Sequence, residues 1–121
     1  MKPLTQTALD PFVARFDHFR SAELRSVEVM NPFEIKITLA AQDKARDYDW
    51  ISISLLFSEV EAVNLVEENQ LDFIDMEDGI SIIYKENKFA FGIGECYNIS
   101  SIERSSLYII AKTLKYEESA F

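Results

Sequence analysis

The chain has 121 residues, of which 48% are hydrophobic and 27% charged, and its formal net charge is −9. This length and composition predict one globular domain and exclude a largely disordered or collagen-like chain. No apolar run approaches the roughly 18 residues of a membrane-spanning helix, and no basic stretch followed by an apolar core marks a secretory signal. The one cysteine, Cys96, cannot form an internal disulfide, which agrees with a reducing compartment. We therefore expect a single domain over residues 1–121, located in the cytoplasm.

The first predicted element is a helix over residues 10–20. Asp10 can cap the free amides of a first turn, and Pro11 suits the first helical position. Phenylalanines then recur at helical spacing and form one apolar stripe, at Phe12, Phe16 and Phe19. Such a stripe needs a hydrophobic surface, and we expect that surface to be the protein's own sheet. A helix that protrudes to bind a partner is the alternative.

From about residue 24 the hydrophobic period changes to two, which is typical of half-buried strands. The clearest alternation consists of Ile35, Ile37, Leu39 and Ala41. Strands are predicted at 24–31 and 34–41 around an Asn31-Pro32 turn, at 50–57, at 80–85 and 88–93 around Glu86-Asn87, and at 106–116. One face of the last strand would carry Tyr108, Ile110, Lys112, Leu114 and Tyr116.

Three segments are less regular. Residues 42–49 and 94–105 are expected to be loops, and 58–70 a short irregular stretch. Leu71, Phe73 and Met76 precede Asp78-Gly79, a dipeptide that favours hairpin turns, and so predict a hairpin between this apolar run and the strand at 80–85. Because the connections are too short for crossover helices, the sheet should be antiparallel. The predicted fold class is α+β, mainly β: an antiparallel sheet or small half-open barrel of six to seven strands with one N-terminal helix.

The negative charge is concentrated in the middle of the chain. Residues 47–84 contain no Lys or Arg, and their acidic residues are Asp47, Asp49, Glu59, Glu61, Glu67, Glu68, Asp72, Asp75, Glu77 and Asp78. Without a basic stripe there is no source of the counterion release that drives nucleic-acid binding, so no nucleic-acid partner is expected. Anionic membranes are disfavoured for the same reason. The field would attract a basic protein or a hard cation, unless the acidity serves only solubility.

The predicted partner-binding residues are the acidic side chains between 59 and 78: Glu59, Glu61, Glu67, Glu68, Asp72, Asp75, Glu77 and Asp78. A calcium loop of the helix–loop–helix type is excluded. Placing Gly79 at its sixth position puts Ile74 and Met76 where acids belong and Lys85 at the twelfth. A looser calcium site and a solvated loop without function are the alternatives to a partner-facing patch.

Residue types that carry catalysis or bind transition metals are scarce. With His18 as the one histidine and Cys96 as the one cysteine, zinc lacks its usual ligands. We expect a surface histidine and a structural or half-exposed thiol, with a Cys–His nucleophile pair as the alternative. Gly92-Ile93-Gly94 lacks the third glycine of a dinucleotide fingerprint, and no serine sits in a Gly-x-Ser-x-Gly elbow. We therefore predict no metal, no cofactor and no enzymatic activity, although a carboxylate pair formed only in space escapes this reasoning.

Aromatic side chains suggest a second functional hypothesis. On predicted strands or at their ends lie Phe33, Phe57, Phe73, Phe89 and Phe91. A small barrel could leave a cavity lined by such rings, so a carrier of a small apolar ligand is the alternative function. The edges of an open sheet also pair readily, which makes a homodimer a further option.

The stretch Trp50-x-x-Ile53-x-Leu55-x-Phe57-x-x-Val60-x-x-Val63 resembles the centre of small β-rich bacterial families of unknown function, some of them grouped with immunity proteins of polymorphic toxin systems. The Asp78-Gly79 turn and the final Ser-Leu-Tyr strand follow in a similar order, so the resemblance spans residues 34–116. It implies a protein that acts by binding, with no catalytic residue to carry over. The predicted function is a non-enzymatic acidic protein-binding module. In its sharpest form it is an immunity-type protein that engages a basic toxin, such as a nuclease, through residues 59–78.

Overall fold

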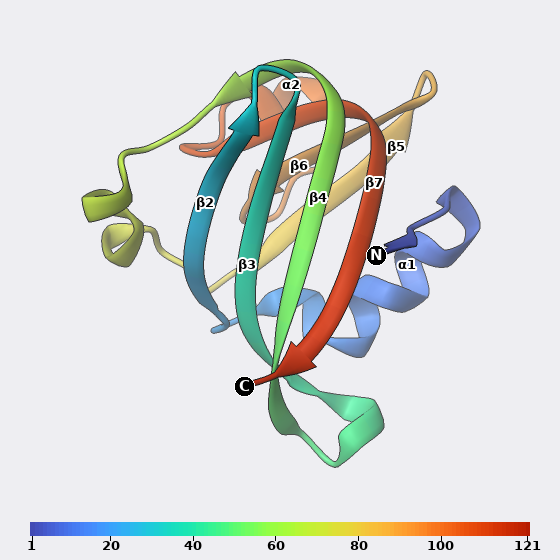
Figure 1. Cartoon of the computed structure of the whole chain (residues 1–121), viewed down its shortest axis with the longest axis vertical. Helices are drawn as coiled ribbons and strands as arrows, with labels where there is room; N and C mark the ends of the chain where they lie inside the picture. The colour runs from blue at the N-terminus through green and yellow to red at the C-terminus, as the bar shows by residue number, and fades with distance from the viewer.

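The computed structural model describes residues 1–121 and shows an antiparallel sheet of seven strands that is not closed, with one N-terminal helix (Figure 1). The strand order is β2-β3-β4-β7-β6-β5, and β1 pairs with β7. The strands are β1 (Lys2–Pro3), β2 (Glu23–Asn31), β3 (Glu34–Asp43), β4 (Asp49–Asn64), β5 (Ile80–Lys85), β6 (Lys88–Ile93) and β7 (Tyr108–Ala120). The helices are α1 (Gln6–Arg15) and α2 (Ile99–Glu103), and the 3-10 segments are η1 (Asp17–Phe19), η2 (Lys44–Arg46) and η3 (Glu68–Phe73). The predicted α+β, mainly β class is confirmed, and none of the helices is long and apolar enough to cross a membrane.

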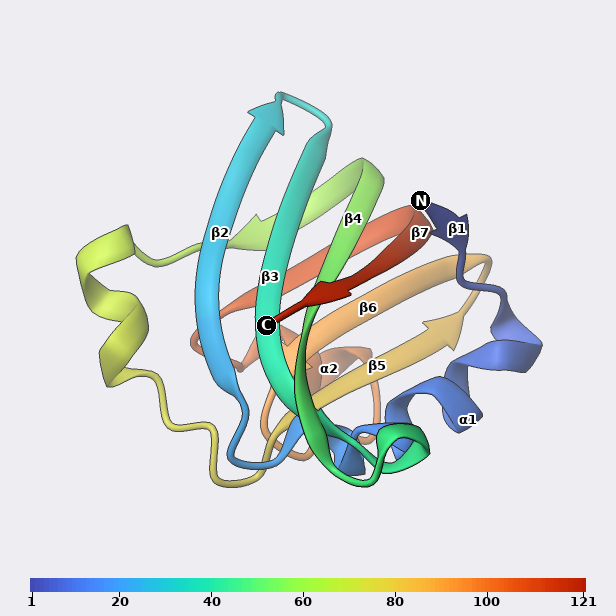
Figure 2. The same cartoon turned by 60° about the horizontal axis from the view of Figure 1, so that its bottom comes forward.

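The long strands β4 and β7 each serve both halves of a sheet that folds over on itself. The first part of β4 pairs with β3, whereas the first part of β7 pairs with β6. Figures 1 and 2 show β5 and β6 running crosswise to β2 and β3. β4 bends at Glu59, where φ is 54, and its register with β7 shifts between Val60 and Ala62. The prediction of an irregular stretch over 58–70 is therefore wrong for residues 58–64, which belong to β4. A bulge breaks the alternation of side chains there without ending the strand.

β7 changes the cluster that its side chains face. Tyr108 and Ile110 pack in a small cluster with Ile102 of α2. Ile109 and Leu114 lie instead in the main core of 26 buried residues. Ile110 and Leu114 thus face different clusters, although in a regular strand two residues four positions apart face the same side. The prediction of one continuous face along this strand is wrong, because the strand bends between these two positions.

Helix α1 begins earlier than its sequence suggested. The side chain of Thr5 caps it by accepting a hydrogen bond from the Ala8 backbone N–H at 3.3 Å. The predicted boundaries 10–20 are therefore wrong at both ends. The helix runs from Gln6 to Arg15 with Pro11 inside it, and positive φ throughout η1 (Asp17–Phe19) prevents it from continuing. Threonine is one of the preferred N-cap residues, so a helix can begin at this point, and it tolerates the lost hydrogen bond and the ring contact that Pro11 causes.

The phenylalanine stripe packs on the protein's own sheet, as expected. Phe12, Phe16 and Phe19 are all buried. The ring centroids of Phe12 and Phe16 are 5.3 Å apart, and those of Phe16 and Phe19 are 5.1 Å apart. Phe12 also lies 4.9 Å from the ring of Tyr116 in β7. The stripe thus packs on itself, and Phe12 joins it to the sheet through Tyr116, while Leu9 and Val13 complete the buried face of the helix.

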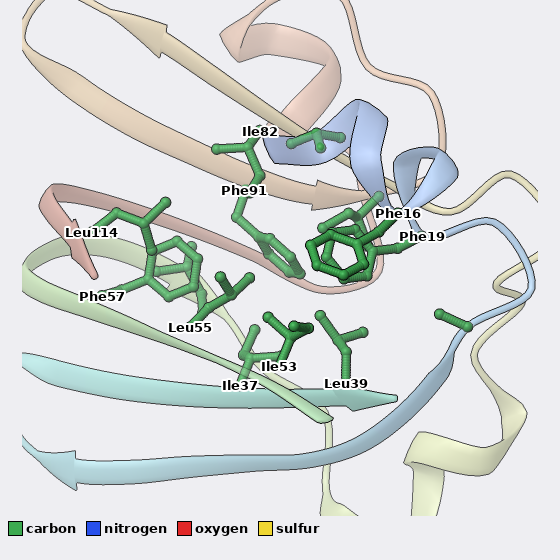
Figure 3. Packing of buried hydrophobic residues seen from close by; sticks show 14 of the residues in the cluster. Phe16, Phe19, Ile37, Leu39, Ile53, Leu55, Phe57, Ile82, Phe91 and Leu114 are labelled. Atoms are coloured by element: carbon green, nitrogen blue, oxygen red, sulfur yellow. The ribbon is translucent and has the colours of Figure 1, made fainter. Parts of the chain in front are cut away.

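Side chains from both halves of the sheet fill the space between them. Phe57 of β4 and Phe91 of β6 are fully buried and meet edge to face with ring centroids 5.5 Å apart. Figure 3 shows Ile37 and Leu39 pointing from β3 toward the same centre. The interior is therefore a packed core.

Two predicted turns are confirmed and one is wrong. The β2–β3 hairpin closes at Asn31, and the β5–β6 hairpin turns at Glu86 and Asn87 with φ of 55 and 63. Asp78-Gly79 does not join two strands, because η3 and irregular backbone precede it. Gly79 instead leads the chain into β5 with φ +70, close to the backbone of η1.

The predicted loop 94–105 contains the short helix α2. Asn98 caps this helix by accepting a hydrogen bond from the Ser101 backbone N–H at 2.8 Å. The Ser101 hydroxyl in turn accepts one from the Asn98 backbone N–H at 3.0 Å. Ile102 is fully buried beneath it. A helix of five residues offers too few periodic positions to be predicted from hydrophobicity.

Gly79 and Gly94 form a matched pair for testing the contact between β5 and η1. Both have positive φ, so alanine is strained at either position. A Cβ at Gly79 would lie 2.0 Å from the His18 carbonyl oxygen, whereas a Cβ at Gly94 meets nothing within 4 Å. We expect Gly79→Ala to lower the free energy of unfolding by about 1–3 kcal/mol more than Gly94→Ala, as for overpacked sites. Urea denaturation checks this, and equal losses in the two variants would contradict it.

Candidate functional site

We call residues 65–79, the connection from β4 to β5, the acidic strap. It carries six of the eight predicted partner-binding residues: Glu67, Glu68, Asp72, Asp75, Glu77 and Asp78. All six side chains are exposed, and none forms an ion pair within 4.0 Å. The negative charge of the strap is therefore not neutralised within the fold.

Buried apolar side chains and backbone bonds hold the strap in place. Leu71 and Met76 are 4% and 9% exposed and belong to the main core. The Met76 carbonyl accepts hydrogen bonds from the Ser21 backbone N–H at 2.8 Å and from the Gly79 backbone N–H at 3.0 Å. Asp75 accepts one from the backbone N–H two residues on, at 2.9 Å. With Leu71 and Met76 pointing in, the strap presents its carboxylates outward.

The structure does not place Glu59 and Glu61 with the strap. Both lie on β4, and the Glu61 carboxylate pairs with Lys88 at 2.7 Å and with Lys112 at 4.0 Å. The hydrogen bond from Lys88 holds the pKa of Glu61 below its ordinary value. The charge of Glu61 is therefore balanced by neighbouring cations, whereas Glu59 is exposed, forms no ion pair and lies on β4 rather than on the strap.

The largest surface hollow lies between the strap and the start of β2. It has a volume of about 610 Å³. Its lining combines apolar residues with a charged rim: Ala22, Leu24, Leu71, Ile74 and Met76, with Glu23, Arg25 and Asp72. Figure 2 shows η3 beside β2 with no strand between them. This groove therefore lies where the sheet fails to close.

β2 forms one edge of the sheet, and its outer backbone groups have no partner. The chain's backbone hydrogen bonds outside its helices and strands include none from Glu23 to Asn31. η3 contacts β2 from the side of the strap, and α1 and η1 contact the opposite edge, β5. Sequence reasoning missed this wall of the site. The alternation that begins at Leu24 indicates a strand. It does not indicate that this strand lies at the edge of the sheet, because the strand order depends on pairing between distant segments.

A second charged cluster lies where α1 meets the sheet. Arg15 donates hydrogen bonds to both oxygens of Asp43, at 2.8 and 2.6 Å, and Asp43 is fully buried. These bonds hold the pKa of Asp43 below its ordinary value. Arg46 lies 3.3 Å from the same carboxylate, and Arg15 also pairs with Glu118 of β7. Every charge in this cluster has an opposite partner, so it fastens the helix rather than attracting a ligand.

His18 and Cys96 line one shared hollow of about 290 Å³, with Asp78 at its rim. Burial raises the pKa of the Cys96 thiol, and its sulfur lies 3.8 Å from the carbonyl oxygens of Ile93 and Ser101. A thiol that is harder to ionise is a poor nucleophile at neutral pH. No group of three or more His, Cys, Asp and Glu side chains converges to hold a metal ion.

Asp43→Asn should destabilise the protein by about 3 kcal/mol at pH 7, because it removes one partner of a buried ion pair. The folded-state pKa of Asp43 is lowered, so its contribution is complete above the unfolded value of about 3.9 and is lost as the pH falls through the folded value. The difference between the native chain and the variant should therefore shrink below about pH 4. Urea unfolding at several pH values measures it. The exposed Asp47→Asn is the control, and a difference that stayed constant in acid would contradict the assignment.

The chain matches no protein-family model, no curated protein and no solved structure. The function proposed below therefore rests on the acidic strap, the groove beside it and the free edge of β2.

Proposed function

We propose that the protein is a non-enzymatic binding module that engages a basic protein through the acidic strap. One observation carries the proposal: six exposed carboxylates share a segment that the core holds in place, with no cation within 4.0 Å. Unpaired charges keep their long-range field, which steers an oppositely charged partner and raises its association rate.

The surroundings of the strap support an interface rather than a merely solvated loop. Protein interfaces combine an apolar centre with a polar rim. Phe73 is 79% exposed among the carboxylates, and the neighbouring groove has an apolar floor that includes Leu71 and Ile74. Charge would bring the partner to this face, and burial of these apolar groups would hold it there.

The sharpest form of the proposal is an immunity-type protein. The resemblance of residues 34–116 to β-rich families grouped with such proteins favours this form. A toxin that cleaves nucleic acid needs a cationic cleft to hold its polyanionic substrate. An acidic strap could cover that cleft and compete with the substrate. We place this role in the cytoplasm, where the free Cys96 gains nothing from oxidation.

The alternative, a carrier of a small apolar ligand, has less support. Phe57 and Phe91 occupy the centre of the space between the halves of the sheet. The largest hollow is the surface groove beside the strap, whose rim carries Glu23, Arg25 and Asp72. An open groove with charged rims suits a polypeptide better than an apolar small molecule.

The test compares two variants that lose the same number of carboxylates. One carries Glu67→Gln, Glu68→Gln, Asp72→Asn and Asp75→Asn, and its control carries Asp47→Asn, Asp49→Asn, Glu103→Gln and Glu117→Gln. Each immobilised chain captures proteins from lysate of the source cell at about 0.05 M and about 0.5 M salt. The native chain and the control should retain a basic protein at low salt and release it at high salt. The strap variant should associate with that protein about tenfold more slowly and with a weaker dependence on salt.

Two results would count against the proposal. One is a strap variant that retains the same protein at the same rate and with the same salt dependence as the control. The other is that the native chain retains no basic protein at either salt concentration.

A further inference from the structure

We propose that the partner contributes an extended basic segment that adds to the free edge of β2 as an antiparallel strand. This inference rests on the proposed function and names the part of the partner that fits the groove. Its occupant is a strand in which lysine or arginine alternates with apolar residues.

The first support is the unsatisfied backbone of β2. A sheet edge presents a row of N–H and C=O groups that can pair with another chain. No other segment of this protein bonds to the outer side of β2 over its nine residues, Glu23–Asn31. The other edge, β5, also lacks such bonds, but α1 and η1 pack against it, whereas only η3 contacts β2 besides its partner strand β3. The outer side of β2 is therefore open to strand addition wherever η3 does not contact it.

The second support is a core-facing side chain that nothing covers. Val27 and Val29 lie opposite Ile37 and Ile35 of β3, so all four share the face that points to the core. Ile35 and Ile37 are buried, yet Val29 is 62% exposed. The missing neighbour is the next strand of the sheet, and an apolar side chain on an added strand would cover Val29.

The third support is the shape of the site. η3 contacts β2 beside the groove, and neighbouring strands lie about 4.8 Å apart, so an added strand would lie along the part of β2 that η3 leaves free and would border the groove. Its inward side chains would meet Leu71, Ile74 and Met76 on the groove's opposite wall. Its basic side chains would lie near Asp72 on the rim and the other carboxylates of the strap.

Charge complementarity favours a basic partner over a second copy of this chain. Two copies paired edge to edge through β2 would bring two acidic straps together, and like charges would repel. The one cation on this edge, Arg25, pairs with Glu23 at 3.1 Å and lies 4.5 Å over the Phe121 ring. It is thus neutralised within the chain and does not oppose a basic strand.

The experiment uses a labelled nine-residue peptide of alternating lysine and valine, which matches the length of β2. Its control has the same residues but is N-methylated at its three central positions, so that it keeps its charge and cannot pair along either side. Fluorescence anisotropy at low salt measures binding, and hydrogen exchange measures protection of the amides of residues 23–31. We expect the unmethylated peptide to bind at least tenfold more tightly and to slow exchange in β2. Glu68→Gln with Asp72→Asn should weaken binding, whereas Asp47→Asn with Asp49→Asn should not.

Three outcomes would overturn this inference. Equal binding of the two peptides would mean that charge alone acts, which leaves the proposed function standing without strand addition. If neither peptide binds, the edge of β2 is not a binding site. The proposed function would then still be tested by the capture of a basic protein from lysate. A dimer with protected β2 amides in the absence of peptide would show that a second copy occupies the edge.

Discussion

The bend of β4 at Glu59 is the constraint on which the rest of the structure depends. β4 and β7 remain paired on both sides of the bend, so the sheet folds over one continuous core. The fold stops short of closure, and β2 and β5 remain the two ends of the strand order. An open sheet must manage both edges. In this molecule one edge lies under the N-terminal helix and the other faces a groove, so the position of the candidate site follows from the failure to close.

The charges divide according to what they do for the fold. Arg15, Asp43 and Glu118 balance one another where α1 meets the sheet, and Glu61 is balanced by two lysines. The carboxylates of the strap have no cationic partners within the chain. Six unpaired carboxylates thus share one segment, and one of them, Asp72, lies on the rim of the groove beside β2. That coincidence of field, groove and edge is what distinguishes this face from an ordinary acidic surface.

Local patterns predicted the regular part of the fold. Ile35 and Ile37 alternate with polar neighbours, and Glu86-Asn87 favours a tight turn, so β3 and the β5–β6 hairpin could be found from neighbouring residues. The bulge at Glu59 could not, because it shifts the alternation that reveals a strand. Leu71 and Met76 favour a strand in the sequence, but they lie in the irregular strap. Their burial explains the apolar pattern, because residues that anchor a strap to the core are as apolar as residues of a strand.

Only half of the candidate site was visible in the sequence. The acidic residues could be predicted because charge needs no fold to be counted. The opposite wall could not, because nothing near Leu24 or Val29 indicates which strand ends the sheet. That position is decided by pairing between β4 and β7, which are separated by more than forty residues in the chain. Functional features that depend on such long-range pairing lie beyond hydrophobic periodicity.

The order of the strands also has a consequence for how the chain is made. β7 is the last strand to be synthesised, yet it lies in the middle of the sheet, between β4 and β6, and it also holds β1. Until it emerges from the ribosome, β2-β3-β4 and β5-β6 are two separate pieces with no strand to join them. Native contacts that span most of the chain form slowly. The nascent protein therefore exposes two additional unpaired edges, and loss of the C-terminal strand would divide the domain instead of shortening it.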